Sequence, residues 1–226
     1  MRVLYFEVGG SIRDRLLGLP NSDVDYSVEA PSFQAIIDDI NSRGGKIYLV
    51  TEAYFTIRAR LNNQDCDFVW CRREDSYSDS RHPDWVEPGT IYDDLARRDF
   101  TCNAIAIDKS GNYIDPHNGI KHIELSILKC VGRTDERMNE DALRMVRALR
   151  FWVTKKLTPE PVLHSFLRNY NNSVLLDKIS DDRIRQELDK MFRYNTDHSI
   201  QVFNLFPAIR RNIFNRLWLK PTSEQR

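Results

Sequence analysis

The sequence predicts an α+β fold, in which a mixed β-sheet with flanking helices is followed by an all-helical region. Short apolar runs with the spacing of strands occur only in the front part of the chain. From Ile123 onward the apolar residues have helical spacing, and no further strand is expected. We therefore predict a front domain over residues 1–130 and a helical domain over residues 131–226.

The composition is that of an ordinary globular protein. The 226 residues are 41% hydrophobic and 29% charged, and a chain of this length can bury a large core. No apolar run approaches the roughly 20 residues of a membrane span, and the N-terminus has no signal-peptide pattern. We expect a cytoplasmic protein with no membrane partner. Its four cysteines have no regular spacing, so we expect buried reduced thiols rather than a disulfide framework or a zinc site.

The formal net charge of zero hides an asymmetry between the two predicted domains. The front domain has an excess of acidic residues, and the helical domain has an equal excess of basic ones. This distribution suits cation binding by the front domain and phosphate binding by the helical domain. Solvated helix faces would explain it equally well.

The stretch from Val8 to Tyr26 combines a phosphate-binding pattern with two carboxylates. A strand ending at Val8 is followed by a break at Gly9-Gly10 and a helix over residues 11–17, whose first N–H groups would cradle phosphate. A second strand then carries Asp23 and Asp25 on one face, because strand side chains alternate. Paired carboxylates suit Mg²⁺, although a solvated strand edge is the commoner meaning of Asp-x-Asp.

Residues 32–98 continue the front domain. We expect a helix over residues 32–42 and strands over 47–50, 54–61 and 65–71. Asp67 would share a strand face with Asp65 and is a candidate third carboxylate, with an ordinary exposed residue as the equal alternative. The polar, proline-containing residues 72–89 predict a long mobile loop, and a short helix is expected over residues 91–98.

Residues 139–152 predict a helix with one narrow polar row. Asp141, Arg144, Arg147 and Arg150 recur at steps of three, and the other residues from Ala142 to Trp152 are apolar. An ordinary wet helix face would be much wider, so the row is expected to line a cleft. Half-buried arginines need anionic or planar partners. Nucleotide phosphates and base edges would supply them, and internal pairs with Asp or Glu are the alternative.

Five motifs, in order, resemble those of the tRNA nucleotidyltransferases, or CCA-adding enzymes, and their bacterial poly(A) polymerase relatives. They are Gly9-Gly10-x-x-Arg13-Asp14 with the later Asp23-x-Asp25; Arg97-Arg-Asp-Phe-Thr-Cys-Asn-Ala104; Asp115-Pro-His-Asn-Gly119; Glu140-Asp-Ala-Leu-Arg144 with Arg147 and Arg150; and the helical segment 179–191.

The resemblance implies a polymerase-β-like nucleotidyltransferase head followed by a helical neck and a shortened body. It implies that Asp23 and Asp25 hold Mg²⁺ and that Asp67 is a third acidic residue of the catalytic set. The implied nucleotide-binding residues are Gly10, Arg13, Arg98, Asp141, Arg144, Arg147 and Arg150.

In this family Asp141 and Arg144 would read the incoming base. Cytosine and adenine both present an amino donor beside a ring-nitrogen acceptor, so a carboxylate and a guanidinium can pair with either. Guanine and uracil reverse that polarity and would leave buried groups unpaired.

The implied reaction is Mg²⁺-dependent, template-independent addition of C and A to the 3′ end of tRNA. The RNA 3′-hydroxyl attacks the α-phosphate of CTP or ATP in line and releases pyrophosphate.

Segment 72–96 is present at full length here, and in this family a full-length segment is associated with A addition. Relatives commonly continue into body and tail regions, so we expect a homodimer or a partner to supply tRNA-binding surface. The alternatives are a poly(A) polymerase or other RNA-tailing enzyme, and a catalytically silent RNA- or nucleotide-binding protein.

Overall fold

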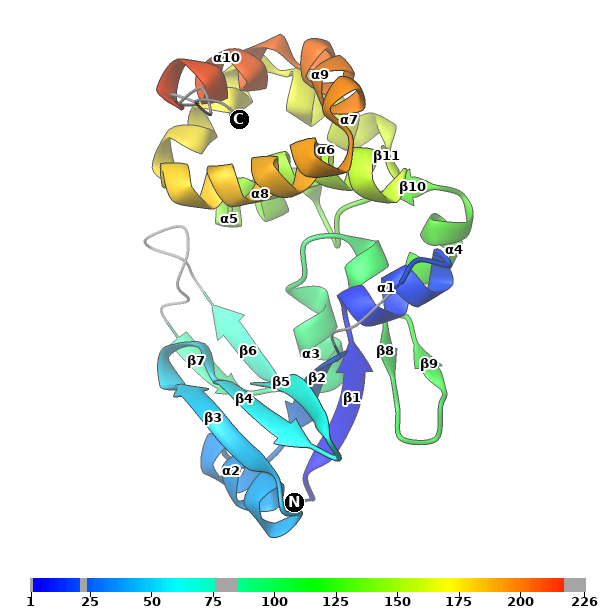
Figure 1. Ribbon diagram of the computed structural model, residues 1–226, viewed down its shortest axis with the longest axis vertical. Helices are drawn as coiled ribbons and strands as arrows, with labels where there is room; N and C mark the ends of the chain where they lie inside the picture. Colours follow the sequence, from blue (N-terminus) through cyan, green and yellow to red (C-terminus); the bar gives the residue numbers. More distant parts are fainter. Residues whose placement is uncertain (1, 21–23, 76–84, 218–226) are drawn as a thin grey trace, which may run out of the picture. The chain divides into compact units, whose positions relative to one another are not determined.

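The computed structural model describes residues 2–20, 24–75 and 85–217 (Figure 1). Contacts divide the chain into two compact units. The first, here called the head unit, comprises Met1–Leu125 and Lys129–Gly132, and the second, here called the helical unit, comprises Ser126–Leu128 and Arg133–Arg226.

The head unit is built on a mixed sheet. Within the described residues it has seven strands in the order β3-β4-β5-β2-β1-β8-β9, with β2 and β5 parallel and the other neighbours antiparallel. The strands are β1 (Leu4–Val8), β2 (Val24–Glu29), β3 (Lys46–Thr51), β4 (Thr56–Leu61), β5 (Gln64–Trp70), β8 (Ala106–Ile107) and β9 (Tyr113–Ile114).

Most of the expected front elements are confirmed. The strand expected over residues 54–61 begins only at Thr56, because Glu52–Tyr54 form a 3-10 helix and Phe55 has a left-handed φ of 50°. The helix expected over residues 91–98 ends at Ala96. All four cysteines are buried and free, as expected.

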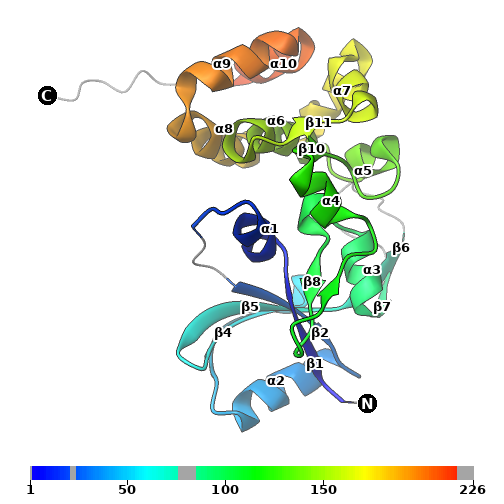
Figure 2. The same cartoon turned by 90° about the vertical axis from the view of Figure 1, so that its right-hand side faces the viewer.

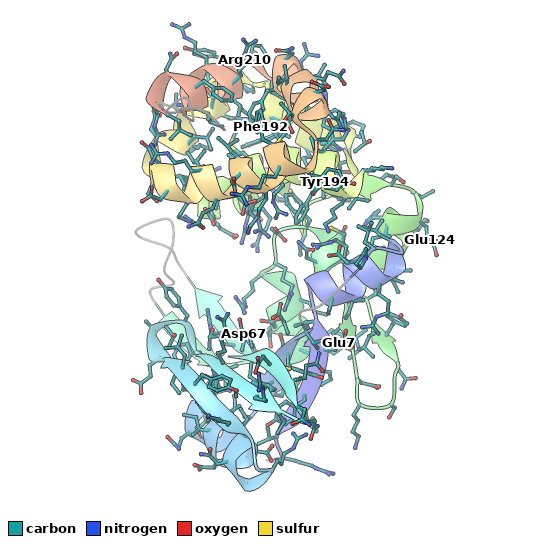
Figure 3. All side chains as sticks on the ribbon, in the orientation of Figure 1. Glu7, Asp67, Glu124, Phe192, Tyr194 and Arg210 are labelled. Atoms are coloured by element: carbon teal, nitrogen blue, oxygen red, sulfur yellow. The ribbon has the colours of Figure 1, made fainter. Side chains whose placement is uncertain are left out.

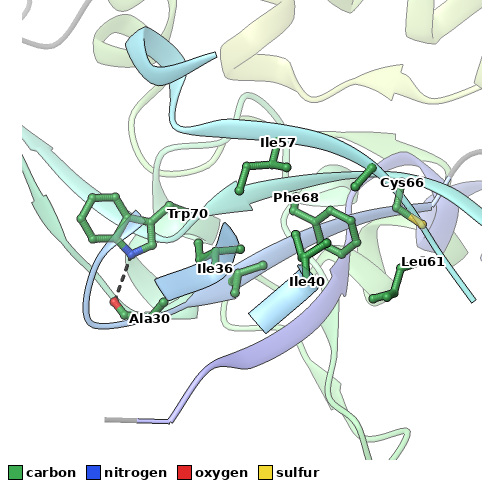
Figure 4. Packing of buried hydrophobic residues seen from close by; sticks show 10 residues of the cluster. Ala30, Ile36, Ile40, Ile57, Leu61, Cys66, Phe68 and Trp70 are labelled. Atoms are coloured by element: carbon green, nitrogen blue, oxygen red, sulfur yellow. Dashed lines mark hydrogen bonds between the residues drawn. The ribbon is translucent and has the colours of Figure 1, made fainter. Parts of the chain in front are cut away.

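Helix α2 (Phe33–Ser42) covers one face of the sheet (Figure 2). The Ser32 hydroxyl caps it by accepting the Ala35 N–H at 3.2 Å. Its buried Ile36 and Ile40 pack onto sheet residues, and the Trp70 indole donates to the Ala30 carbonyl at 3.1 Å (Figure 4). This apolar layer holds the even-numbered residues of β2, so alternation turns Asp25 and Ser27 to the opposite face.

Two helices lie on the face that carries Asp25. Helix α3 (Ile91–Ala96) buries Ile91 and Leu95 against Phe6 and Val8 of β1. Helix α1 (Gly10–Leu16) follows directly on β1 and contacts both β1 and β2. Helix α3, which directly precedes the second motif, therefore covers this face, and α1, which carries residues of the first motif, lies against the strands beside Asp25.

The expected loop over residues 72–89 is wrong at both ends. Strands β6 (Arg72–Asp75) and β7 (Trp85–Pro88) form an antiparallel ladder, and residues 76–84 lie outside the described chain. The polar composition is misleading because Arg72 is buried, donating to the Tyr54 carbonyl at 2.6 Å and lying 5.3 Å from the Phe55 ring centre.

The helical unit contains two further departures from expectation. A short parallel pair of strands, β10 (Ile127–Leu128) with β11 (Thr158–Pro159), lies where no strand was expected.

The helices of this unit are α5 (Thr134–Glu140), α6 (Leu143–Lys155), α7 (Pro161–Arg168), α8 (Asp181–Tyr194), α9 (Thr196–Leu205) and α10 (Pro207–Arg216), with a 3-10 segment at Tyr170–Lys178.

The single helix expected over residues 139–152 is instead two helices. Asp141 has extended backbone angles, φ −147° and ψ 102°, between α5 and α6. Its Oδ1 accepts the Leu143 N–H at 3.1 Å. Because aspartate side chains compete for nearby backbone N–H groups, they favour helix starts over helix interiors. Asp141 therefore lies in the break before α6 rather than in its polar row.

The third motif forms a tight turn against the second. Gly119 begins α4 (Gly119–Glu124), and the Asp115 carboxylate accepts the N–H groups of Gly119 at 2.6 Å and Ile120 at 2.9 Å. A Cβ on Gly119 would lie 2.2 Å from the Thr101 carbonyl oxygen. The glycine is needed here for close approach of two backbones.

We expect Gly119→Ala to destabilise the protein by about 3 kcal/mol, because the new methyl group must displace the backbone of the second motif. Urea unfolding would measure this loss. Gly132→Ala is the control, since Gly132 has open space around it and a φ of 68°. Its cost should be only the left-handed penalty of about 1 kcal/mol. Equal losses for the two variants would contradict the steric explanation.

Candidate functional site

The turn after β1 brings three predicted nucleotide-binding residues together. Gly9 has a φ of 82°, and a Cβ there would lie 3.0 Å from Nη1 of Arg98. A Cβ on Gly10 would lie 3.4 Å from Nη2 of Arg13. Glycine at both positions lets the two guanidinium groups approach the backbone of the turn. Gly10, Arg13 and Arg98 thus form one cluster, although the predicted contacts with a triphosphate remain a prediction.

Arg13 links the first motif to the second. It is only 7% exposed, and its Nη1 donates to Oδ1 of Asn103 at 2.5 Å. Asn103 in turn donates to Oδ1 of Asp99 at 2.8 Å. The side chain of Arg13 also binds Asp14 through Nε at 2.9 Å and Nη2 at 3.0 Å. The asparagine and aspartate of the second motif therefore hold the arginine of the first.

Asp94 is the hub of the cluster and was not predicted as a site residue. It is fully buried, and its Oδ2 accepts from Ser27 at 2.7 Å and from Nη2 of Arg98 at 2.8 Å, while Oδ1 pairs with Arg97. Burial by itself opposes ionisation, but Arg97 and Arg98 outweigh it and hold the pKa of this carboxyl well below its usual range. The sequence indicates this role only through the spacing of Asp94, which lies four residues before Arg98.

Asp25 and Asp67 are neighbours across two strands. They are direct partners in the parallel register of β2 and β5, so both carboxylates leave the same face of the sheet. Figure 3 labels Asp67 on this sheet. Both oxygens of Asp67 are bound by Arg58, Oδ1 by Nε at 2.7 Å and Oδ2 by Nη2 at 2.8 Å. Asp23 lies outside the described residues.

Carboxylate chemistry at this place fits Mg²⁺. The ion commonly uses one or two protein carboxylates and completes its shell with water and substrate phosphates. Within residues 2–20, 24–75 and 85–217, no group of three or more His, Cys, Asp or Glu is arranged to hold a metal ion.

In the helical unit the polar row is held by acidic partners. Nη1 of Arg144 donates to Glu140 at 2.8 Å and to the Arg137 carbonyl at 3.0 Å. Arg150 binds Glu187 and lies 4.3 Å from the Phe151 ring centre, and Arg147 lies 3.7 Å from the same glutamate. Internal pairs, the alternative left open by the sequence, are thus present.

Helix α8, which contains the fifth motif, supplies two partners that were not predicted as site residues. Nη2 of Arg183 donates to Oδ2 of Asp141 at 2.8 Å, and Glu187, only 5% exposed, lies one helical turn later. Residues four apart lie on one helix face, so a single face of α8 holds both ends of the row. Neither residue shares a sequence pattern with the row, so only the packing of α6 on α8 reveals the pairing.

Comparison with known proteins places the chain in a family. The model of the poly(A) polymerase head domain matches residues 4–129, which include the first three motifs. The chain belongs to the poly(A) polymerase head-domain family.

Several members of the family are similar over most of the chain. A CCA-adding enzyme of Streptococcus mutans is 40% identical over 195 residues, covering 84% of this chain and 45% of that protein. One of Lactobacillus johnsonii is 38% identical over 190 residues, covering 83% of this chain and 45% of that protein. The chain thus spans less than half the length of these relatives.

Solved structures of CCA-adding enzymes share the fold. The Bacillus stearothermophilus enzyme in complex with CTP superposes with a TM-score of 0.77 at 29% identity, over 92% of this chain and 49% of that one. The Thermotoga maritima enzyme complexed with tRNA-CCA gives a TM-score of 0.75 at 24% identity, over 97% of this chain and 50% of that one.

No helix in the part of the chain that the structure describes has the length and apolar character to cross a membrane.

Asp94→Asn should destabilise this family member by about 3 kcal/mol, because it leaves two arginines beside a buried neutral group. Asp38→Asn, on the exposed outer side of α2, is the control and should cost little. Because the folded pKa of Asp94 is depressed, its contribution is complete above its unfolded pKa of about 3.9 and is lost as pH falls below that value. Thermal unfolding from pH 7 to pH 3 should show the deficit of Asp94→Asn narrowing only below about pH 4. A deficit unchanged down to pH 3 would contradict the charge-based explanation.

Arg183→Gln should destabilise the protein by about 1 kcal/mol, because it removes the hydrogen bond that Nη2 of Arg183 donates to Oδ2 of Asp141. Urea unfolding would measure this loss. The control is Arg185→Gln on the same helix, since Arg185 is 48% exposed on its side chain and pairs with Asp182 at 3.2 Å, so its loss should cost little. Equal losses in the two variants would contradict a specific role for the Arg183–Asp141 pair.

Proposed function

We propose that the chain adds C and A to the 3′ end of tRNA from CTP and ATP, without a template, and releases pyrophosphate. The observation that carries the proposal is the link between the glycine turn and the carboxylate strand. Arg98 lies against Gly9 and also donates to Ser27 at 3.2 Å, two residues after Asp25 on the same strand face. A triphosphate site beside a metal-binding carboxylate is what nucleotidyl transfer requires. The CCA-adding relatives, one solved with CTP, support this reading.

Asp25, with Asp23, would hold Mg²⁺ in this proposal. When bound, the ion would neutralise phosphate charge and lower the pKa of the attacking 3′-hydroxyl. Asp25 would fix the ion at the strand end nearest the glycine turn. Asp67 would belong to the same acidic set, but both of its oxygens are bound by Arg58. That contact favours a role for Asp67 in orienting its neighbours.

Arg13 and Arg98 would bind the phosphates. Each is fixed before substrate arrives, Arg13 by Asn103 and Arg98 by Asp94. Preorganised donors lose little freedom on binding, so they stabilise developing phosphate charge at small entropic cost. The leaving pyrophosphate would carry several negative charges, so two arginines near the turn would stabilise it better than one.

Asp141 and Arg144 would read the base. Asp141 accepts one hydrogen bond on each oxygen, from Leu143 and Arg183. A carboxylate has about four acceptor sites, so it can still accept the amino group of cytosine or adenine. Arg147 and Arg150, which contact Glu187, would also bind the nucleotide.

Poly(A) addition is the second candidate, because the matching family model describes a poly(A) polymerase head. It uses the same carboxylates and phosphate-binding arginines, and differs in how many A residues are added. A catalytically silent RNA-binding protein is the third candidate, and the retained Asp25 in its strand register argues against it.

The decisive experiment offers purified protein and Mg²⁺ three tRNAs, ending before CCA, after C and after CC, with each nucleotide supplied separately. We expect C, C and A to be added in order and addition then to stop, as read by sequencing the 3′ ends. Long A tails would show that the activity is polyadenylation and not CCA addition. No extension of any RNA would overturn the enzymatic proposal.

Asp25→Asn tests the metal assignment in the same assay. We expect activity to fall by more than about 100-fold, since even outer-shell changes at metal sites cost 10–100-fold. Asp38→Asn is the matched control and should keep full activity with the same unfolding temperature. Full turnover by Asp25→Asn would contradict the assignment of Asp25 to the metal site.

A further inference from the structure

The face of the sheet that carries Asp25 continues, strand by strand, to its β3 edge. Asp25 pairs with Asp67 of β5, Asp67 with Arg58 of β4, and Arg58 with Leu49 of β3. Directly paired residues share a face. Asp25 and Leu49 therefore lie in one row of residues that runs from β2 through β5 and β4 to β3. Neighbouring strands are about 4.8 Å apart, so the row is roughly 14 Å long.

The β3 end of this face is aromatic and basic. Tyr48 is 46% exposed and Leu49 is 54% exposed. The Tyr48 ring centre lies 5.6 Å from Nζ of Lys46 and 6.0 Å from the guanidinium carbon of Arg60. Lys46 pairs directly with Arg60, so two cations lie beside one exposed ring, and Arg58, two residues away on β4, adds a third cation to the same face.

We propose that this surface, formed by Lys46, Tyr48, Leu49, Arg58 and Arg60, binds the single-stranded RNA just upstream of the reacting 3′ end. The inference rests on the proposed function for the identity of the RNA. A base would stack on Tyr48, and the backbone phosphates would meet the cations. Sequence-tolerant recognition of single strands commonly combines such a stacking platform with basic side chains.

The arginines of this surface are held in fixed orientations. Nε and Nη2 of Arg60 bind the two oxygens of Asp65 at 2.8 Å and 2.7 Å. Arg58 binds Asp67 in the same side-on manner. Side-on pairing fixes the guanidinium plane, so a phosphate meets an ordered donor. The surface thus carries three cations, Lys46, Arg58 and Arg60, whose donors suit the phosphates of an RNA backbone.

RNA fits this surface better than an added protein strand does. The register of β3 against β4 shifts between Ile47 and Leu49, so Tyr48 is an extra, bulged residue. Bulges and edge lysines such as Lys46 are devices that prevent another strand from pairing with a sheet edge. They leave side chains of the face available for stacking.

The test compares Tyr48→Ala, Tyr48→Phe and Tyr113→Ala. Tyr113 lies on β9 at the other end of the sheet and is also 46% exposed, which makes it a matched control. The probes are a labelled short single-stranded RNA, measured by fluorescence anisotropy, and the KM for a tRNA ending before CCA. We expect Tyr48→Ala to weaken RNA binding and raise this KM about tenfold, as loss of one stacked base does. The KM for CTP should not change.

Tyr48→Phe should bind RNA like the parent, because stacking needs only the ring, and Tyr113→Ala should also bind normally. Unchanged RNA affinity in Tyr48→Ala, with an active parent, would overturn this inference alone. Equal losses in Tyr48→Ala and Tyr113→Ala would also overturn it. A parent that binds RNA through Tyr48 but adds no nucleotide would overturn the proposed function and leave the surface assigned.

Discussion

The buried carboxylate of Asp94 is the interaction on which the head unit's candidate site depends. It joins three separate parts of the chain, because it belongs to α3, binds the arginines of the second motif and accepts the hydroxyl of Ser27 on the carboxylate strand. A buried carboxylate is tolerated only with such partners. The position of Arg98 against the glycine turn therefore follows from the burial of an acid that itself touches no predicted substrate.

Local rules predicted much of the head unit. Alternation along β2 placed Asp25 away from the apolar layer of α2, and the register with β5 set Asp67 beside it. The glycine turn after β1 was also readable, because positive φ and close approach at Gly9 both need a residue without a side chain. These features depend on neighbours in sequence or on one strand pairing, which a periodic pattern encodes.

The features that could not be predicted depend on distant partners. Arg72 is buried by the backbone of Tyr54, so a polar segment forms a strand. The break at Asp141 is stabilised by Leu143 on one side and Arg183 of α8 on the other. In a helical wheel Asp141 is indistinguishable from the arginines that follow it. Only the competition between its side chain and the helix backbone separates them.

The two units use the same electrostatic device at their candidate sites. Asp94 binds Arg97 and Arg98 in the head unit, and Glu187 binds Arg150 and lies near Arg147 in the helical unit. One buried acid contacts both guanidinium groups and so helps to fix their orientation. Removing the acid would leave two partly buried cations beside each other, which would repel. Internal pairing of the arginine row is therefore compatible with nucleotide binding by the same residues, because an arginine that is already oriented loses little freedom when it binds phosphate.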